Sequence, residues 1–357
     1  YLALNLVAEH FGTTGIFNGF KLLEQQANQH FHMILKRDDP NYFDLPGLSV
    51  LIGGLWIANL NYWGCNQYIT QRALGANLKT ARGGILFAAF LKLLMPAIVV
   101  LPGIAAYVLH QQGNFQTEMM QGNELNPDRA YPVLLNILPE GLKGLAFAAL
   151  TAAVVASLAG KANSISTIFT LDIYKKRLHP EASEKKLVWI GRVTIVVAMI
   201  LAIIISPFLG IDKKGGFQYI QEYTGFVSPG IFAMFILGFF WKKTTSDAAL
   251  FATIAGFVLS VILKFMPNVV DLSFLAPVGF SKANGAGVYE IPFMDRMAIT
   301  FVFCVIGMYI ISMIETRKGV KPHGLEIDAK MFKSSPGFTV GLLIVVGILV
   351  ALYSVYW

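Results

Sequence analysis

The stretch Trp56–Arg72, WIANLNYWGCNQYITQR, decides how this chain folds. Apolar sequence leads into it and basic residues close it, which is typical of a helix that crosses a bilayer. An unpaired polar group in hydrocarbon costs several kcal/mol. The side-chain amides of this stretch must therefore bond to neighbouring helices or line a polar cavity. They belong to Asn59, Asn61, Asn66, Gln67 and Gln71.

The composition excludes an ordinary soluble protein. Of 357 residues, 55% are hydrophobic and only 14% are charged, against roughly 25% charged in soluble domains. The net charge of +7 does not indicate a nucleic-acid partner, because the charges lie in clusters between apolar runs, like the loop charges of membrane proteins. Cys65 and Cys304 both lie in apolar runs and predict neither a disulfide framework nor a zinc site.

Membrane-spanning helices need about 20 apolar residues each. Tyr1 begins a sequence that reads as the tail of a span, so we expect a fragment that lacks its N-terminal part. Residues 14–34 predict a surface helix with Phe17, Phe20, Leu23 and Ala27 on one face, and 267–292 predict an outer loop. Roughly eight complete spans are predicted, at residues 47–71, 84–110, 142–174, 187–209, 217–241, 248–266, 293–314 and 337–357.

The distribution of Lys and Arg predicts the orientation of these spans. The loops around 72–82, 175–192, 242–243 and 317–333 are rich in both residues, and the alternate loops are poorer. The positive-inside rule makes the basic loops cytoplasmic. We therefore expect a multi-pass protein of the plasma (inner) membrane with its C-terminus, Trp357, outside.

Two polar features lie within the first two predicted spans. Asn59, Tyr62, Trp63 and Asn66 are spaced i, i+3, i+4, i+7 and share one face of a continuous helix. They favour either bonds to neighbouring helices or a polar ligand site. Lys92 lies roughly 12 Å into its span, where a lysine indicates function unless it snorkels to the headgroups.

Three further features concern later spans. Small residues dominate 147–169, which favours close helix packing, and Ser157 offers an oxygen to a hard cation such as Na⁺. Residues 215–230 predict a broken helix, in which Glu222 lies near the outer end or pairs internally. Lys264, near a span end, is expected to snorkel.

Gly53 and Gly54 predict a loosened helix in the first span.

The motifs of common enzymes are absent from the sequence. It contains no HExxH, no GxSxG, no phosphate loop and no Cys/His cluster. Amides, aromatic rings and one lysine, spread over three helices, suit the recognition of hydroxyl groups. The sequence therefore predicts a binding or transport protein and not an enzyme.

Four stretches carry a resemblance to a known family: GGLWIANLNYWGCNQYITQRAL, FAAFLKLLMP, NSISTIFTLDIYKK and FQYIQEYTGFVSPGI. In order and spacing they resemble the solute:sodium symporter family, and most of all its bacterial sodium/galactose (glucose) branch. The resemblance implies an all-α integral membrane protein with a LeuT-type core of two inverted five-helix repeats. It assigns 1–46 to the end of a preceding helix and an outer loop, 47–242 to the second repeat, and 243–357 to three peripheral helices.

The resemblance also implies site residues. The family's sugar-binding Asn, inner-gate Tyr, sugar-binding Lys and Gln fall on Asn59, Tyr62, Lys92 and Gln221. Its Na⁺ ligands fall on the carbonyl of Ala153, the hydroxyl of Ser157 and the position of Ala156. The family's sugar transporters have a serine at that last position, so one oxygen ligand is missing here.

The function that the resemblance implies is Na⁺-coupled import of a galactose- or glucose-like sugar by alternating access. Na⁺ is the coupling ion, and neither an organic cofactor nor nucleic acid is expected. Alternatives are a symporter or uniporter for another polyol or acid, such as myo-inositol or sialic acid, and a membrane sugar sensor that does not transport. The oligomeric state is not predicted.

Overall fold

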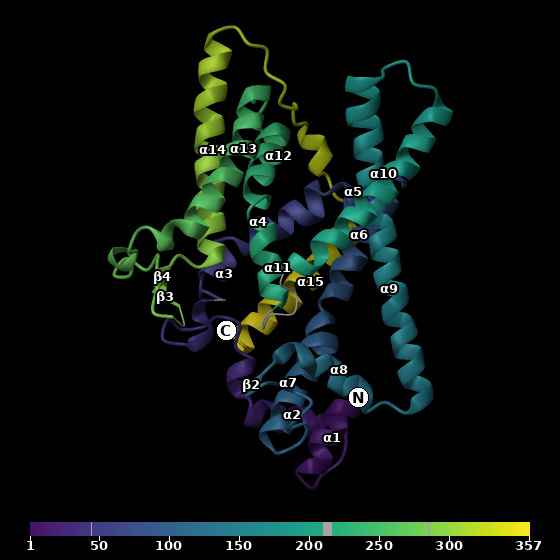
Figure 1. Ribbon diagram of the computed structural model, residues 1–357, viewed down its shortest axis with the longest axis vertical. Coiled ribbons are helices and arrows are strands. Elements are labelled where there is room, and N and C mark those ends of the chain that lie inside the picture. Colours follow the sequence, from purple (N-terminus) through teal and green to yellow (C-terminus); the bar gives the residue numbers. More distant parts are fainter. Residues whose placement is uncertain (44, 210–215, 285) are drawn as a thin grey trace. The chain divides into compact units, whose positions relative to one another are not determined.

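The computed structural model describes residues 1–43, 45–209, 216–284 and 286–357. Helices dominate it, and the strands in the described part form two short antiparallel hairpins, β1 (Met120–Gln121) with β2 (Glu124–Leu125) and β3 (Lys282–Ala283) with β4 (Tyr289–Glu290) (Figure 1). The chain divides into two units. Unit 1 is Tyr1–Phe31 with Leu94–Phe217, and unit 2 is His32–Leu93 with Gln218–Trp357.

Unit 1 contains a small core of short helices: α1 (Leu2–His10), α2 (Ile16–Gln26), α7 (Leu101–Gln111) and α8 (Ala130–Asn136). The surface helix predicted at 14–34 is α2, which ends at Gln26. Leu23 and Ala27 are buried as expected, but Phe17 is 84% exposed. Phe17 therefore does not belong to the packed face, which includes Phe20 through its edge contact with Phe31.

Unit 1 also contains two long membrane helices. The first is α9 (Glu140–Thr167), which continues as a π-helix to Leu178, and the second is α10 (Glu184–Ile205). They meet at Gly191, whose carbonyl accepts a hydrogen bond of 3.0 Å from Ser166 Oγ. A Cβ at Gly191 would lie 2.8 Å from the same hydroxyl, so a larger residue there would displace the Ser166 side chain.

The first predicted span of unit 2 is a broken helix. It consists of α3 (Ser49–Ile52), α4 (Leu55–Leu60), a π-helical turn (Asn61–Cys65) and α5 (Gln67–Leu74). The first break lies at Gly53 and Gly54, as predicted. A Cβ at Gly54 would lie 2.5 Å from the carbonyl oxygen of Met294, so backbone meets backbone there.

Three helices of unit 2 form its most closely packed part: α12 (Ser228–Phe240), α13 (Ser246–Phe265) and α14 (Phe293–Arg317) (Figure 1). Ala233, Ala248, Ala252, Cys304 and Met308 form its core and are fully buried. Hydroxyl pairs join its helices: Thr245 lies 3.3 Å from Ser312, and Ser260 donates to Thr300. We call these three helices the α12–α14 bundle.

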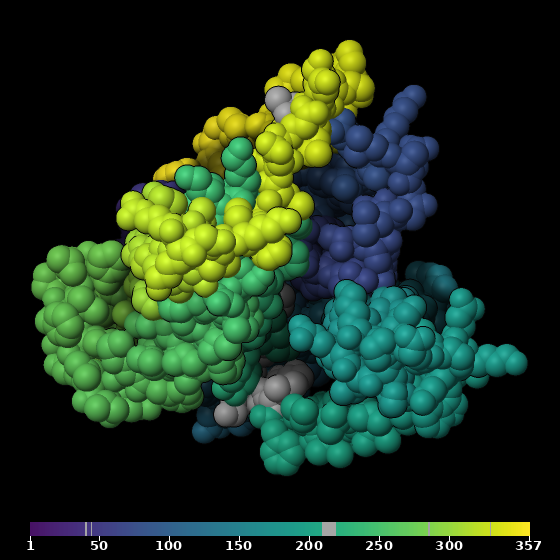
Figure 2. Space-filling model, turned by 90° about the horizontal axis from the view of Figure 1, so that it is seen from above, coloured from purple at the N-terminus to yellow at the C-terminus, as the bar shows by residue number. Residues whose placement is uncertain are grey.

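The chain returns across one end of the α12–α14 bundle after α14. The backbone N–H groups of His323 and Leu325 donate to the carbonyls of Thr244 and Gly238, each at 2.8 Å. Figure 2 shows this yellow-green segment above the green helices. It leads to α15 (Pro336–Val355), which packs against α6 (Leu78–Lys92).

The predicted spans correspond to two kinds of helix. Among the described residues, six helices are long and apolar enough to cross a membrane. The remaining two predicted spans, 47–71 and 217–241, are interrupted helices, the second being α11 (Gly216–Thr224) followed by α12. The six are Leu78–Gln111, Glu140–Leu178, Glu184–Phe208, Ser246–Asn268, Phe293–Arg317 and Pro336–Val355.

The breaks at Gly53–Gly54 and at Gly225–Val227 fall where glycine was expected to cause them, whereas the π-helical turn and the extended backbone at Asn66 were not predicted. The second break lies at Gly225–Val227, before Ser228 and Pro229 begin α12. Gly215, the first residue of the stretch predicted to break, lies outside the described residues. The loop predicted at 267–292 holds only short helical turns and the β3–β4 hairpin, apart from residue 285, which is not described.

Gly230 lies where α12 and α13 pack with their backbones in contact. A Cβ at Gly230 would lie 2.3 Å from the carbonyl oxygen of Ala252, whereas a Cβ at Gly238, on the same helix, meets nothing within 4 Å. Gly230→Ala should therefore lower stability by about 1–3 kcal/mol through overpacking. Gly238→Ala is the matched control and should be neutral or slightly stabilising, because alanine is the better helix former. Thermal unfolding of the purified protein in detergent measures both, and equal melting temperatures would contradict this packing.

Candidate functional site

Helix α4 is attached to the α12–α14 bundle by one face. The Trp56 ring makes edge-to-face contacts with Phe232 and Phe301, at centroid distances of 5.8 and 5.3 Å, and Ile57 is fully buried. Asn59 lies on the exposed side. Its Nδ2 donates to the carbonyl of Leu55 at 2.9 Å, and its side-chain oxygen remains available to accept a hydrogen bond.

The π-helical turn Asn61–Cys65 changes the predicted polar face. A π-helix has i→i+5 bonds, and such turns are frequent at functional sites. Tyr62 and Trp63 are 39% and 41% exposed in this turn. Asn66 has extended backbone, and its side-chain oxygen accepts the N–H of Tyr68 at 3.0 Å as the N-cap of α5. Asn66 therefore caps a helix and does not share the face of Asn59 and Tyr62, contrary to the prediction from a regular helix.

Lys92 contacts this aromatic turn from another helix. It is the last residue of α6, and its ammonium lies 4.6 Å from the centroid of the Trp63 ring, a cation–π contact. The Trp63 ring in turn meets Tyr62 edge to face at 5.5 Å. The structure thus brings together two of the predicted substrate residues, Tyr62 and Lys92, through Trp63. The sequence placed Trp63 on the polar face but did not show that it contacts Lys92.

Gln221 lies on α11, also in unit 2, and is half-buried. Its backbone carbonyl accepts the N–H of Gly225 at 3.0 Å and the hydroxyl of Thr224 at 3.1 Å, where α11 ends. Within the described part of the chain, its side chain forms no hydrogen bond with Asn59, Tyr62 or Lys92. The amide of Gln221 is therefore available to a ligand.

Glu222, the neighbour of Gln221, forms internal ion pairs. This is one of the two alternatives expected from the sequence, the other being a position near the outer end of the span. One carboxylate oxygen accepts from the Arg296 guanidinium and lies 2.8 Å from Lys264 Nζ. Lys264 is therefore an ion-pair partner, which corrects the expectation that it snorkels. The reason is that α11 ends beside α13 and α14, a juxtaposition that hydropathy does not reveal.

The predicted cation ligands lie on α9, in unit 1. Ala153 and Ser157 are four residues apart, so they lie on one face of the helix, and the carbonyl of Ala153 points along the axis toward the turn that carries Ser157. Ser157 is half-buried, and its hydroxyl has no hydrogen-bond partner in the described ranges. Ala156 presents an exposed methyl group between them. Two protein oxygens and no carboxylate suit a hard monovalent cation better than a transition metal.

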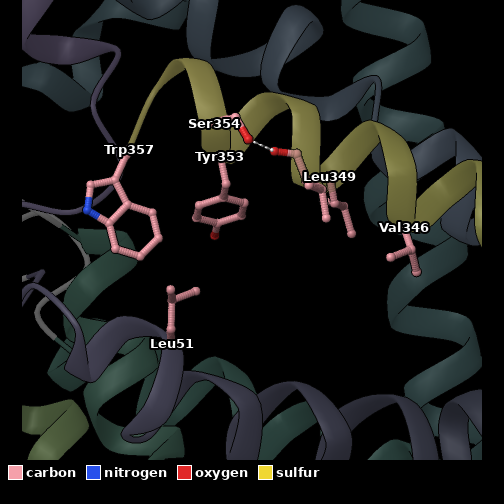
Figure 3. Close-up of a pocket in the computed structure, with 7 residues that line it drawn as sticks. Leu51, Val346, Leu349, Tyr353, Ser354 and Trp357 are labelled. Atoms are coloured by element: carbon pink, nitrogen blue, oxygen red, sulfur yellow. Dashed lines mark hydrogen bonds between the residues drawn. The ribbon is translucent and has the colours of Figure 1, made fainter.

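A large apolar groove lies elsewhere in unit 2. It encloses about 690 Å³ between Leu51 of α3 and the residues Val346, Leu349, Tyr353 and Trp357 of the C-terminal segment (Figure 3). Ser354, its hydroxyl-bearing residue, already donates to Val350 O at 2.7 Å. The groove contains none of the predicted substrate residues and offers few groups that could bind hydroxyls.

Comparison with known proteins relates the sequence to one family. The sequence model of the sodium:solute symporter family matches residues 6–256. A sodium/glucose cotransporter of Vibrio parahaemolyticus is 43% identical over 364 residues, which cover 100% of this chain and 62% of the relative. The human sodium/myo-inositol cotransporter 2 is 37% identical over 73% of this chain and 41% of its own length. The chain therefore spans less than two thirds of the length of these relatives.

Proposed function

The chain belongs to the sodium:solute symporter family, and from this premise we propose that it forms part of a Na⁺-driven importer of a galactose- or glucose-like sugar. The observation that carries the proposal is the contact of Lys92 with Trp63 beside Tyr62, close to the amide-bearing helix α4. A charged donor, an amide and aromatic rings are the groups that recognise a pyranose.

Each substrate residue has a defined chemical task in this proposal. Asn59 and Gln221 can each donate to and accept from neighbouring sugar hydroxyls, and Lys92 only donates. The sugar ring has an apolar face and carries its hydroxyl groups at the edge. The ring of Tyr62 covers the apolar face, and its hydroxyl remains free to form a hydrogen bond. Relatives named for glucose and for myo-inositol both carry ring polyols, which is consistent with a hydroxyl-reading site.

The coupling ion in this proposal is Na⁺, held on α9 by the carbonyl of Ala153 and the hydroxyl of Ser157, with no organic cofactor. One Na⁺ that crosses 100 mV supplies about 2.3 kcal/mol, and a tenfold concentration gradient adds about 1.4 kcal/mol. Together they sustain a few hundredfold accumulation of sugar. The methyl group of Ala156 contributes no ligand, so Na⁺ binding is weaker than in a site with a serine pair.

The chain is a multi-pass membrane protein, and its orientation is part of the proposal. The basic loops face the cytoplasm by the positive-inside rule, which leaves Trp357 on the outer side of the plasma (inner) membrane. The residues assigned to the second inverted repeat are 47–242, and the three helices after them are peripheral.

Uptake of labelled sugar into vesicles that bear the full-length protein tests the proposal. Glucose, galactose, myo-inositol and sialic acid are compared with an inward Na⁺ gradient and with choline in its place. Na⁺-dependent accumulation of a hexose supports the proposal. Preferred accumulation of myo-inositol or sialic acid would change the substrate, Na⁺-independent equilibration would indicate a uniporter, and binding without uptake would indicate a sensor.

Lys92→Ala should abolish concentrative sugar uptake while the protein remains in the membrane. A hydrogen bond from a charged donor contributes about 1.5–3 kcal/mol, so its loss should raise the sugar concentration for half-maximal binding about 10- to 100-fold. Lys79→Ala is the control, because Lys79 lies on the same helix and is exposed at its start. A wild-type affinity for sugar in Lys92→Ala would show that Lys92 does not bind the sugar and instead snorkels to the headgroups.

Ala156→Ser should strengthen the dependence on Na⁺. The new hydroxyl adds one oxygen beside Ser157, a gain on the order of 1 kcal/mol for a contact of hydrogen-bond scale. The Na⁺ concentration for half-maximal uptake should fall several-fold at fixed membrane potential. Ala159→Ser, one turn further along α9, serves as the control and should leave the Na⁺ dependence unchanged. If both variants or neither shift it, the ion site lies elsewhere.

A further inference from the structure

A cluster of four charged residues joins α11 to the outer loop and to two helices of the α12–α14 bundle. It consists of Glu222 on α11, Lys264 on α13, Glu290 on β4 and Arg296 on α14, and we call it the Glu222 cluster. Lys264 Nζ lies 2.8 Å from Glu222 and 4.0 Å from Glu290. The side chain of Arg296 is only 6% exposed. With two carboxylates and two cations, the cluster is neutral as a whole.

Glu222 is the centre of the cluster, because both cations contact the same carboxylate oxygen, Oε1. Glu290 is held separately, since its Oε1 accepts from the side-chain amide of Asn284. Removing one partner of a buried, hydrogen-bonded ion pair leaves the remaining charge without compensation, which is strongly destabilising. The cluster therefore restrains where α11 can lie relative to α13 and α14.

Hydrophobic packing contributes little to the position of α11. None of the described side chains of this helix is buried, and Ile220 and Tyr223 are 44% and 43% exposed. The next residues, Gly225–Val227, interrupt the helix before α12. Tight contact resumes only at Gly225, where a Cβ would lie 3.0 Å from Met297 Sδ. Among the described side chains of α11, Glu222 forms the ion pairs that join this helix to α13 and α14.

Gln221 and Glu222 are adjacent on this helix, and this determines what the ion contacts control. Successive side chains of an α-helix point about 100° apart, so a fixed direction for Glu222 fixes the direction of Gln221. Rotation of α11 by a single residue would turn the Gln221 amide away by that same angle. A hydrogen bond to a ligand does not survive such a displacement.

We propose that the Glu222 cluster is a positioning device, in which the contacts of Glu222 with Lys264 and Arg296 set the rotation of α11 and thereby aim the Gln221 amide at the substrate. Glu222 itself does not touch the substrate in this proposal. The inference deepens the proposed function and rests on it for the identity of the ligand as a sugar. The orientation of Gln221 can, however, be measured without any sugar.

The first measurement therefore reports orientation alone. Gln221→Cys is made in full-length protein that also carries Cys65→Ser, and the rate of its reaction with a small polar maleimide is measured with and without Glu222→Gln. The proposal expects the labelling rate to change at least several-fold. Glu326→Gln is the control, because Glu326 forms an exposed ion pair with Lys242 at 3.7 Å on the same unit, and it should leave the rate unchanged.

The second measurement is equilibrium binding of labelled sugar to the purified protein. Glu222→Gln keeps the shape of the side chain and removes its charge, and it should weaken binding roughly fivefold or more, as expected when a charged hydrogen-bond network is broken. Glu222→Asp, which retains the charge, should restore part of the affinity. In a Gln221→Ala background, Glu222→Gln should have no further effect, because residues that act through one another are not additive.

The outcomes separate this inference from the proposed function. An unchanged labelling rate, or the same loss of affinity in both backgrounds, overturns the positioning role and leaves the sugar proposal intact. If the wild-type protein binds no sugar, the proposed function fails, and the labelling rates alone then decide whether Glu222 orients Gln221. Equal melting temperatures of wild type and Glu222→Gln are required, and a variant that unfolds is replaced by Lys264→Gln or Arg296→Lys.

Discussion

Hydrocarbon offers polar groups no hydrogen-bond partner. The amides, hydroxyls and charges within the spans must therefore find their partners within the protein or in a polar cavity. Where a span is regular, hydroxyls bond back to their own helix, as Thr151 does to the carbonyl of Phe147 at 2.9 Å. Where a span is broken, a side chain replaces the lost backbone partner, as Asn66 does for α5. Among the described residues, the side-chain oxygen of Asn59, the amide of Gln221 and the hydroxyl of Ser157 are left without such a bond, and they are candidates for binding a ligand.

Close packing of small residues supplies the rigid part of unit 2. Gly230, Ala252 and Gly256 allow α12 and α13 to approach until backbone meets backbone, and the two hydroxyl pairs join the bundle to α14. The bundle carries α4 through the Trp56 contacts and restrains α11 through the Glu222 cluster. The α12–α14 bundle therefore contacts two of the helices that carry candidate substrate residues.

The candidate residues divide between the two units. Those for the substrate lie on α4, the π-helical turn, α6 and α11 of unit 2, and those for the cation lie on α9 of unit 1. The substrate residues lie at irregular points of the backbone: a π-turn, the end of a helix and the turn before a break. Irregular backbone is tolerated within a membrane where it lines a polar cavity, which agrees with the chemistry of the side chains found there.

The sequence alone determined the class of protein, the spans and the places where two of them break. Hydropathy and the positions of Gly53, Gly54 and Gly225 are local properties, so they can be read along the chain without knowledge of any neighbour. Regular helical spacing wrongly placed Asn66 on the face of Asn59 and Tyr62, because a π-helical turn adds a residue to the helical turn and the Asn66 side chain then caps α5. Only the tertiary structure decided that Lys92 lies over Trp63 and that Lys264 pairs with Glu222 and does not snorkel. Each of these contacts joins helices that are 29 or more residues apart in sequence, and their partners depend on how the helices rotate and cross, which periodicity within one helix does not specify.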